Sequence, residues 1–299
     1  MKRHVTILVA LAVLALGWSM RLQLDKAFFQ EDCRTNDISQ ETSEVFRWHG
    51  SIAPGGVVEI KTINGDINAE ATSGNEVEVV AIKHGQPDLH GQIDIQIVKR
   101  NDGISICAVY PSDDPHRPNE CRPRGSGPMN VHNYDLGVDF RVRVPWGVRF
   151  IGHAENGDVV AASLGGPVEA YAINGNARIS TSDYAMGRTI NGSLAASIGS
   201  TTWKKPLQFG TVNGSIVLDL PVGASAEVRA ESLNGQISTD FPLTVEGGSN
   251  SKCLNATLGS GGRELALQTL DGSIRLCRAP QYFVSMEARV DPMVAVRYE

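Results

Sequence analysis

The chain has 299 residues, a net charge of −6 and a pI of about 5.7. It contains no basic patch of the density that nucleic-acid binding requires, so its composition gives no electrostatic reason to bind nucleic acid or an anionic surface. Aromatic residues make up 6% of the chain and glycine occurs 31 times, which indicates a thin interior and frequent turns.

The N-terminus predicts export. Lys2 and Arg3 precede an apolar run over residues 5–18, which is the order of a secretory signal. The run is shorter than the about 20 residues that a bilayer span needs. Residues 1–21 are therefore expected to be a signal peptide or an uncleaved N-terminal membrane anchor that acts through residues 5–18. Either outcome places the body outside the cytoplasm, in the periplasm, at the cell surface or anchored to the inner membrane.

The rest of the chain divides by pattern. Residues 22–50 are polar and are expected to link the export segment to the body or to lead into it as a strand. Residues 51–278 form the expected β-strand repeat domain, which carries an insertion over residues 76–136. Residues 279–299 are a C-terminal tail that adds a last strand or hangs free.

The insertion predicts strands of its own. Residues 77–83 read as a strand, and the Asn-Asp-Gly sequence at 101–103 predicts a hairpin between residues 93–98 and 104–109. A long Pro-rich loop follows over residues 111–136, and loops of this length are often functional or disordered.

One short phrase recurs seven times in the body. It consists of a small residue, a variable one, Asn or Asp, Gly, a variable residue and an apolar one. Alternating apolar positions after each bend have the period of a strand. Asn-Gly and Asp-Gly tolerate positive φ, so they are expected to bend the chain between strands. The predicted structural turns are Asn64, Gly65, Asn156, Gly157, Asn174, Gly175, Asn191, Gly192, Asn213, Gly214, Asn234, Gly235, Asp271 and Gly272.

The spacing of the phrases predicts the architecture. Most of them recur about every twenty residues, which is typical of stacked repeat folds. We expect an all-β, β-solenoid or β-helix-like stack with an antiparallel hairpin insertion, in which the asparagines of successive rungs form a hydrogen-bonded ladder. An Asn-Gly turn is also a hairpin signal, so a β-sandwich built of meanders stays open as the alternative.

The repeated phrase resembles the bacterial putative-adhesin family of secreted Gly-rich β-strand repeat proteins, a domain of unknown function. Residues 211–216 and 269–274 carry the resemblance most clearly, and it extends over residues 50–278. The resemblance implies a β-repeat fold and export to the cell envelope or surface. It supplies no catalytic residues.

The five cysteines fit an oxidising compartment. Cys107 and Cys121 flank part of the Pro-rich loop, and a disulfide between them would close that loop. Cys253 and Cys277 lie near the last repeat, where a second disulfide would join adjacent strands. Cys33 is left over.

No catalytic, cofactor or metal site is predicted. The histidine pairs His84 with His90 and His116 with His132 lack the short spacing of metal ligands and read as solvated loop residues. Neither a phosphate loop nor a nucleophile-elbow motif is present in the sequence. Seven polar residues follow the bends, and few of them are carboxylates. These residues are Asp66, Asp158, Asn176, Ser193, Ser215, Gln236 and Ser273.

The sequence therefore predicts an exported, non-enzymatic module for envelope or surface attachment, or a structural scaffold. The expected partner is an envelope or extracellular ligand, a glycan or a protein, contacted through the exposed rung faces and the loop over residues 111–136. Two alternatives stay open: a β-helix polysaccharide lyase or glycosidase with carboxylates along one groove, and a membrane-anchored envelope-stress accessory protein.

Overall fold

The computed structural model describes residues 44–85, 92–112, 114, 116–123, 135–245, 250 and 252–279. All of them belong to one of two compact units, Thr42–Glu299, and the other unit, Met1–Glu41, lies outside the described residues. The predicted export segment, most of the tail, His90, His132 and Cys33 also lie outside them.

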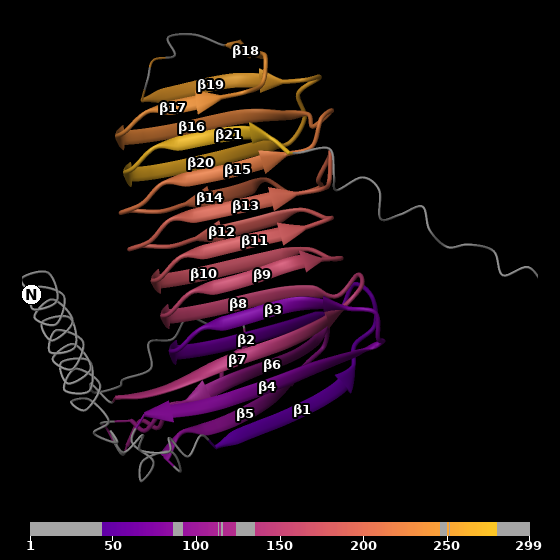
Figure 1. Ribbon diagram of the computed structural model, residues 1–299, viewed down its shortest axis with the longest axis vertical. Coiled ribbons are helices and arrows are strands. Elements are labelled where there is room, and N and C mark those ends of the chain that lie inside the picture. Colours follow the sequence, from indigo (N-terminus) through magenta and orange to yellow (C-terminus); the bar gives the residue numbers. More distant parts are fainter. Residues whose placement is uncertain are drawn as a thin grey trace, which may run out of the picture. The chain divides into compact units, whose positions relative to one another are not determined.

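The regular elements among the described residues are strands in two large sheets, so the all-β prediction is confirmed (Figure 1). Sheet A contains, in spatial order, β1 (Val45–Ser51), β4 (Glu76–Gly85), β7 (Leu136–Pro145), β3 (Ile67–Thr72), β9 (Val159–Leu164), β11 (Ala177–Thr181), β13 (Leu194–Ile198), β15 (Ile216–Leu220), β21 (Ile274–Arg278) and β17 (Ile237–Thr239).

Sheet B faces sheet A across a shared core. Its strands, in spatial order, are β18 (Leu243–Val245), β19 (Cys253–Leu258), β16 (Ala226–Asn234), β20 (Glu264–Asp271), β14 (Leu207–Gly210), β12 (Ala185–Arg188), β10 (Val168–Asn174), β8 (Arg149–Asn156), β2 (Val57–Asn64), β6 (Gly103–Val109) and β5 (Asp94–Arg100).

From β8 to β17 the chain alternates between the sheets, and each repeated phrase carries it from a strand of sheet B to a strand of sheet A. Neighbouring strands in this central part are parallel and in register: Val168 lies beside Phe150, and Ala177 lies beside Val159 and Leu194. A meander would pair consecutive strands antiparallel. In this central part, each pair of consecutive strands forms one rung, with one strand in each sheet.

The rungs do not stack in sequence order throughout. The rung made by β20 and β21 lies between the rung of β14 and β15 and the rung of β16 and β17. The chain reaches it through β18 and β19, which run antiparallel along the edge of sheet B. Because every rung carries a similar bend, the inserted rung keeps the backbone bridge between Asn213 and Asp271.

The insertion extends both sheets beyond the first rung. Strands β5 and β6 form the predicted hairpin at the edge of sheet B, with Ile97 beside Ile106. Strands β4 and β7 are antiparallel neighbours in sheet A, and β1 adds the edge strand beside β4. Antiparallel pairs thus lie at one end of sheet A and at both ends of sheet B, beside a parallel centre, so both sheets are mixed.

The core is built from the positions that the alternating pattern predicts. The third residue after each Asn or Asp of the bends points inward, and it is fully buried at Ile67, Val159, Ala177, Leu194, Ile216 and Ile274. In β17, at the end of sheet A, the equivalent Ile237 is only partly buried. Full burial of a valine, leucine or isoleucine side chain contributes about 1.5–3 kcal/mol relative to exposure, so these stacked rows stabilise the fold.

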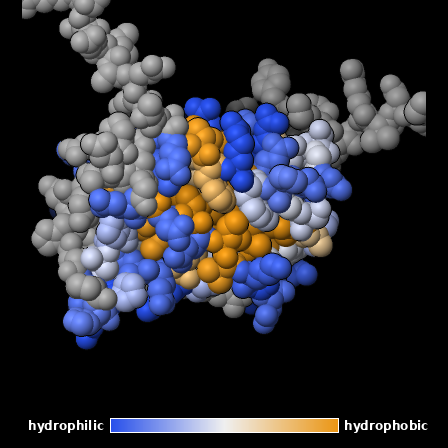
Figure 2. Space-filling model, turned by 90° about the horizontal axis from the view of Figure 1, so that it is seen from below, coloured by the Kyte–Doolittle hydropathy of each residue, from blue (hydrophilic) through white to orange (hydrophobic). Residues whose placement is uncertain are grey.

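The core reaches the surface at the end of the stack where β1 and β5 are the edge strands. Figure 2 shows apolar side chains gathered on this end. Phe46, Trp48 and Ile95 pack partly buried against the core, and Ile97 is 39% exposed.

Candidate functional site

The bends carry a ladder of amide side chains, as the sequence suggested. Each asparagine donates from Nδ2 to Oδ1 of the residue one rung below, at 2.7–2.8 Å. The pairs are Asn156 to Asn64, Asn174 to Asn156, Asn191 to Asn174, Asn213 to Asn191 and Asn234 to Asp271. At the step between Asn213 and Asp271, the described residues show a backbone bridge but no side-chain bond. A carboxylate has no proton to donate, so Asp271 interrupts the ladder.

The polar residues that follow the bends also bond between rungs. The backbone N–H of Asp158 donates to Asp66 Oδ1 at 2.8 Å, and that of Asn176 donates to Asp158 Oδ1 at 2.7 Å. The same bond recurs at Ser193, Ser215, Ser273 and Gln236. Side-chain oxygens at these positions satisfy backbone donors of the next rung. Their role in the structure is to hold the stack together.

Close stacking explains the small residue and the glycine of each phrase. Thr189, Thr211 and Thr269 each donate a hydroxyl hydrogen bond of 2.7–2.8 Å to the glycine carbonyl of an adjacent rung. A Cβ on Gly214 would lie 2.0 Å from the carbonyl oxygen of Gly192. The sequence predicted that glycine is needed at the bends because φ is positive there. This prediction is wrong for four bends, where φ lies outside the left-handed region: those of Gly175, Gly192, Gly214 and Gly235. Contact between rungs is what requires glycine there.

The Pro-rich loop folds back on the outer face of sheet B. Cys107 on β6 is joined to Cys121 by the predicted disulfide, with a Cα–Cα distance of 5.5 Å. Lys61 Nζ donates to the carbonyl oxygen of Arg122 at 2.7 Å, and the N–H of Cys121 donates to Gln96 Oε1 at 3.2 Å. The described part of the loop is therefore fastened to the sheet at three points.

The second disulfide raised by the sequence does not form. Cys253 and Cys277 are free thiols in the structure. Cys253 begins β19 of sheet B and Cys277 lies in β21 of sheet A, so the two residues belong to opposite sheets. Burial raises the pKa of the Cys277 thiol, which keeps it protonated and poorly reactive.

The histidines are dispersed. His84 lies on β4, with Nε2 3.4 Å from Asp139 Oδ1, and is not a loop residue as expected; His116 is exposed, and its backbone N–H donates to Asp114. The described residues contain no group of three or more His, Cys, Asp or Glu side chains placed to hold a metal ion. They also include no helix long and apolar enough to cross a membrane.

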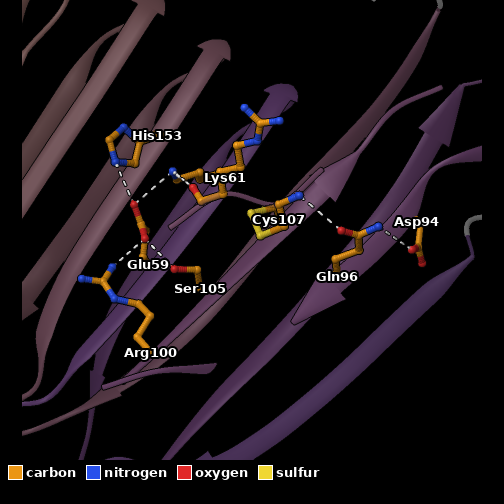
Figure 3. Close-up of a disulfide and its surroundings, with 10 residues drawn as sticks. Glu59, Lys61, Asp94, Gln96, Arg100, Ser105, Cys107 and His153 are labelled. Carbon is orange, nitrogen blue, oxygen red and sulfur yellow. Dashed lines mark hydrogen bonds and ion pairs between the residues drawn. A yellow bond between two sulfur atoms is a disulfide. The ribbon is translucent and has the colours of Figure 1, made fainter. Parts of the chain in front are cut away.

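A buried charged cluster lies next to the disulfide, on the outer face of sheet B (Figure 3). Its centre is Glu59 on β2, which is 1% exposed. Arg100 Nη1 lies 2.6 Å from Glu59 Oε2, and Ser105 Oγ donates to the same oxygen at 2.5 Å. Lys61 Nζ and His153 Nε2 lie 3.2 Å and 3.4 Å from Oε1. Four side chains, from β2, β5, β6 and β8, therefore converge on one carboxylate.

The cluster keeps Glu59 ionised. Burial disfavours the charged form, but the hydrogen bonds from His153 and Ser105 and the charge of Lys61 outweigh it and hold the pKa of Glu59 well below its usual range. Such a carboxylate is a weak base, and its oxygens are already engaged. The geometry of the cluster fits a structural network of ion pairs and hydrogen bonds that joins β2, β6 and β8. It does not fit a general acid or base.

Further along sheet B, the outer face is hollowed into a groove of about 490 Å³. We call it the sheet B groove; it is lined by, among others, Tyr171, Arg188, Gln208, Gly210, Gln268 and Arg229. Its floor follows from the strand register, because Gly210 on β14 lies between Arg188 on β12 and Gln268 on β20. With no side chain at Gly210, neighbouring side chains stand as walls on both sides.

The groove has one apolar wall. In five of the seven bends the residue before the Asn or Asp is an exposed aliphatic one, and in register these five residues form a row. Their exposed fractions run from 37% to 57% at Ile173, Ile190, Val212, Leu270 and Leu233. Ile173, Ile190 and Val212 line the groove itself.

The remaining walls of the groove are polar. Arg188 donates from Nη2 to Gln208 Oε1, and Tyr171 donates from its hydroxyl to Glu169 at 3.2 Å while its ring stacks on His153. Burial raises the pKa of Tyr171, although the charges of Arg188 and Arg149 act in the opposite direction. The phenol is therefore neutral at ordinary pH.

Neither the Glu59 cluster nor the groove was predicted from the sequence. Glu59 and Lys61 alternate with the buried Val58 and Ile60, which marks one face of a strand but does not reveal what covers it. Arg188 and Arg229 are 41 residues apart, and the inserted rung of β20 and β21 lies between their strands. The groove thus brings together two arginines from distant parts of a chain whose net charge is −6.

No family model matches this chain, and no curated protein matches its sequence. Solved structures that resemble it include a putative cell adhesion protein from Clostridium sporogenes, with a TM-score of 0.44 and 11% identity over 79% of this chain and 100% of the other. A putative adhesin from Bacteroides fragilis has a TM-score of 0.32 and 11% identity, over 78% of this chain and 97% of the other. A putative adhesin from Parabacteroides merdae has a TM-score of 0.26 and 9% identity, over 78% and 96%.

Proposed function

We propose that this chain is an exported, non-enzymatic binding module that attaches to an envelope or extracellular ligand through the outer face of sheet B. Its alternating rungs would serve as a β-solenoid-type scaffold, and residues 1–21 would act as its export signal or membrane anchor. The observation that carries the proposal is the sheet B groove, a shallow site whose walls come from neighbouring rungs.

The rigidity of the scaffold supports this function. Each wall residue of the groove lies on a strand, or directly beside a bend, whose backbone is bonded to the rungs above and below. A preformed surface loses little conformational entropy when it binds. Repeated rungs also offer similar contacts at regular intervals, which suits an elongated ligand.

The chemistry of the groove favours binding over hydrolysis. Glycosidases use two carboxylates that flank the scissile bond. Among the groove-lining residues only Glu264 carries a carboxylate. Glu227 lies beside Glu264 in the strand register and accepts a hydrogen bond from Thr257, and Glu59 of this face is buried and bonded to four side chains.

The test is to incubate the full-length protein with isolated cell-envelope polymers and purified polysaccharides, and to measure both retained protein and released sugar ends. We expect retention without release of reducing ends or unsaturated sugars. Release that disappears in the Glu264→Gln variant would replace the binding module with an enzyme. Absence of retention on every polymer would contradict attachment.

A further inference from the structure

We propose that the sheet B groove binds a polysaccharide that carries carboxylates, with Arg188 and Arg229 holding acidic groups on either side of the floor at Gly210. This inference rests on the proposed function and names the class of ligand. It concerns side chains that neither the repeated phrase nor the bends explain.

The positive charges of the groove are available to a ligand. Both Arg188 and Arg229 are exposed on the outer face of sheet B. The described residues show no ion pair for either of them; the Arg188 guanidinium bonds to the neutral amide of Gln208. Guanidinium groups bind carboxylates through paired N–H donors. Two arginines stand against the single carboxylate of Glu264 in the lining, so the groove complements an anion.

The spacing of the two arginines suits a chain rather than a single small anion. In sheet order, β14 and β20 lie between the strands of Arg188 and Arg229. Three strand spacings of about 4.8 Å separate their backbones, which is roughly 14 Å. A polymer with an acid on successive units can contact both residues across this distance.

The neutral side chains between the arginines match a sugar. Gln208 and Gln268 each present both a donor and an acceptor, which is what hydroxyl groups require. Ile190 and Val212 are 43% and 37% exposed along the same site, and they offer apolar contact to the C–H faces of sugar rings.

An extended acidic peptide fits this position less well. Peptides often bind sheets by adding a strand to an open edge. Strands β14 and β20 have partners on both sides, so their backbone groups are already paired. A peptide at the groove would leave its own backbone groups without strand partners, whereas a sugar chain relies on hydroxyl and carboxylate groups that side chains can bind.

The experiment measures the affinity of the full-length protein for polygalacturonate, its fully methyl-esterified form, neutral dextran and poly-L-glutamate, by calorimetry at low and high salt. Polygalacturonate should bind, and esterification or added salt should weaken binding about tenfold or more, because charge-assisted hydrogen bonds are lost. Arg188→Gln and Arg229→Gln should each weaken it by about tenfold. Arg178→Gln and Arg275→Gln, exposed on sheet A, are the matched controls and should leave the affinity unchanged.

A second variant tests the floor without removing charge. A Cβ added at Gly210 would have its nearest neighbours at 3.8 Å, so Gly210→Leu should fill the groove and weaken binding while the melting temperature stays the same. Equal affinity for the ester or for dextran would overturn the anionic class, and so would normal binding by the arginine variants. Tighter binding of poly-L-glutamate would assign the groove to acidic peptides instead. Failure to bind any of the four polymers would also overturn this inference, whereas retention on envelope polymers would still support the proposed function.

Discussion

The glycine of each repeated phrase serves the stack more than the turn. At Gly157, Gly175, Gly192, Gly214 and Gly272, an added Cβ would lie 2.0–2.1 Å from the carbonyl oxygen of the glycine one rung away. A backbone carbonyl cannot move aside without disrupting the backbone hydrogen bonds of its own rung. Glycine at the bend is therefore a condition for the spacing between rungs.

Gly214→Ala should lower the free energy of unfolding by about 1–3 kcal/mol, because the methyl group overlaps Gly192. Gly210→Ala, four residues earlier on the same rung, is the matched control, since its Cβ meets nothing closer than 3.8 Å. Exposed His116→Ala should also change little. Urea unfolding of the three variants measures the effect. Equal losses at Gly214 and Gly210 would mean that stacking does not limit this position.

Asp271→Asn should stabilise the protein by about 0.5 kcal/mol. The amide would supply the donor that the ladder lacks between Asn213 and Asp271, and it would keep an oxygen for Asn234. The reverse change within the ladder, Asn191→Asp, removes the donor to Asn174 and should destabilise by a similar amount. Thermal unfolding measures both. If both variants shifted the melting temperature in the same direction, the donor and acceptor roles given to the ladder residues would be wrong.

Glu59 links stability to pH. Its pKa in the folded protein lies below the unfolded value of about 4.3, so its contribution is complete above that pH and is lost as the pH falls toward the folded pKa. Glu59→Gln should cost about 3–5 kcal/mol at neutral pH, because Lys61 and Arg100 lose their buried counter-charge. The difference between wild type and variant should narrow below about pH 4. A difference that stays constant from neutral to acidic pH would show that Glu59 does not titrate in this way.

At the scale of the elements, the disulfide is the covalent link that holds the Pro-rich loop to β6. The bond between Cys107 and Cys121 spans 14 residues, and a loop of that length contributes about 3 kcal/mol through the entropy of the unfolded chain. Cys107→Ser with Cys121→Ser should lower the unfolding free energy by about that amount. Cys253→Ser with Cys277→Ser should not, because both are free thiols. Denaturant unfolding under oxidising conditions compares the two pairs, and equal losses would refute a structural role for the bond.

The strands themselves could be predicted because each carries its own signal. Alternating apolar residues and Asn-Gly bends identify β9, β11, β13 and β15, and the Asn-Asp-Gly turn identifies the hairpin of β5 and β6. The positions of strands within the sheets carry no such signal. Because β20 and β21 have the same bend as every other rung, the sequence does not indicate that they insert beside β14 and β15.

At the scale of the molecule, the candidate site could not be predicted for the same reason. The groove exists because Arg188, Gly210 and Gln268 become neighbours through the order of the rungs. The Glu59 cluster likewise joins Arg100 of the hairpin to His153, far along the chain. Both sites depend on contacts between segments, whereas the repeated phrase describes only contacts that every rung makes.

At the same scale, we propose that the outer face of sheet B, and not that of sheet A, is the attachment surface. Two double variants with the same loss of charge test it most directly: Arg188→Gln with Arg229→Gln on sheet B, and Arg178→Gln with Arg275→Gln on sheet A. Retention of each folded protein on isolated envelope polymers is the measurement. The account predicts that the sheet B variant loses retention while the sheet A variant keeps it. Equal retention of the two, or loss confined to the sheet A variant, would contradict it.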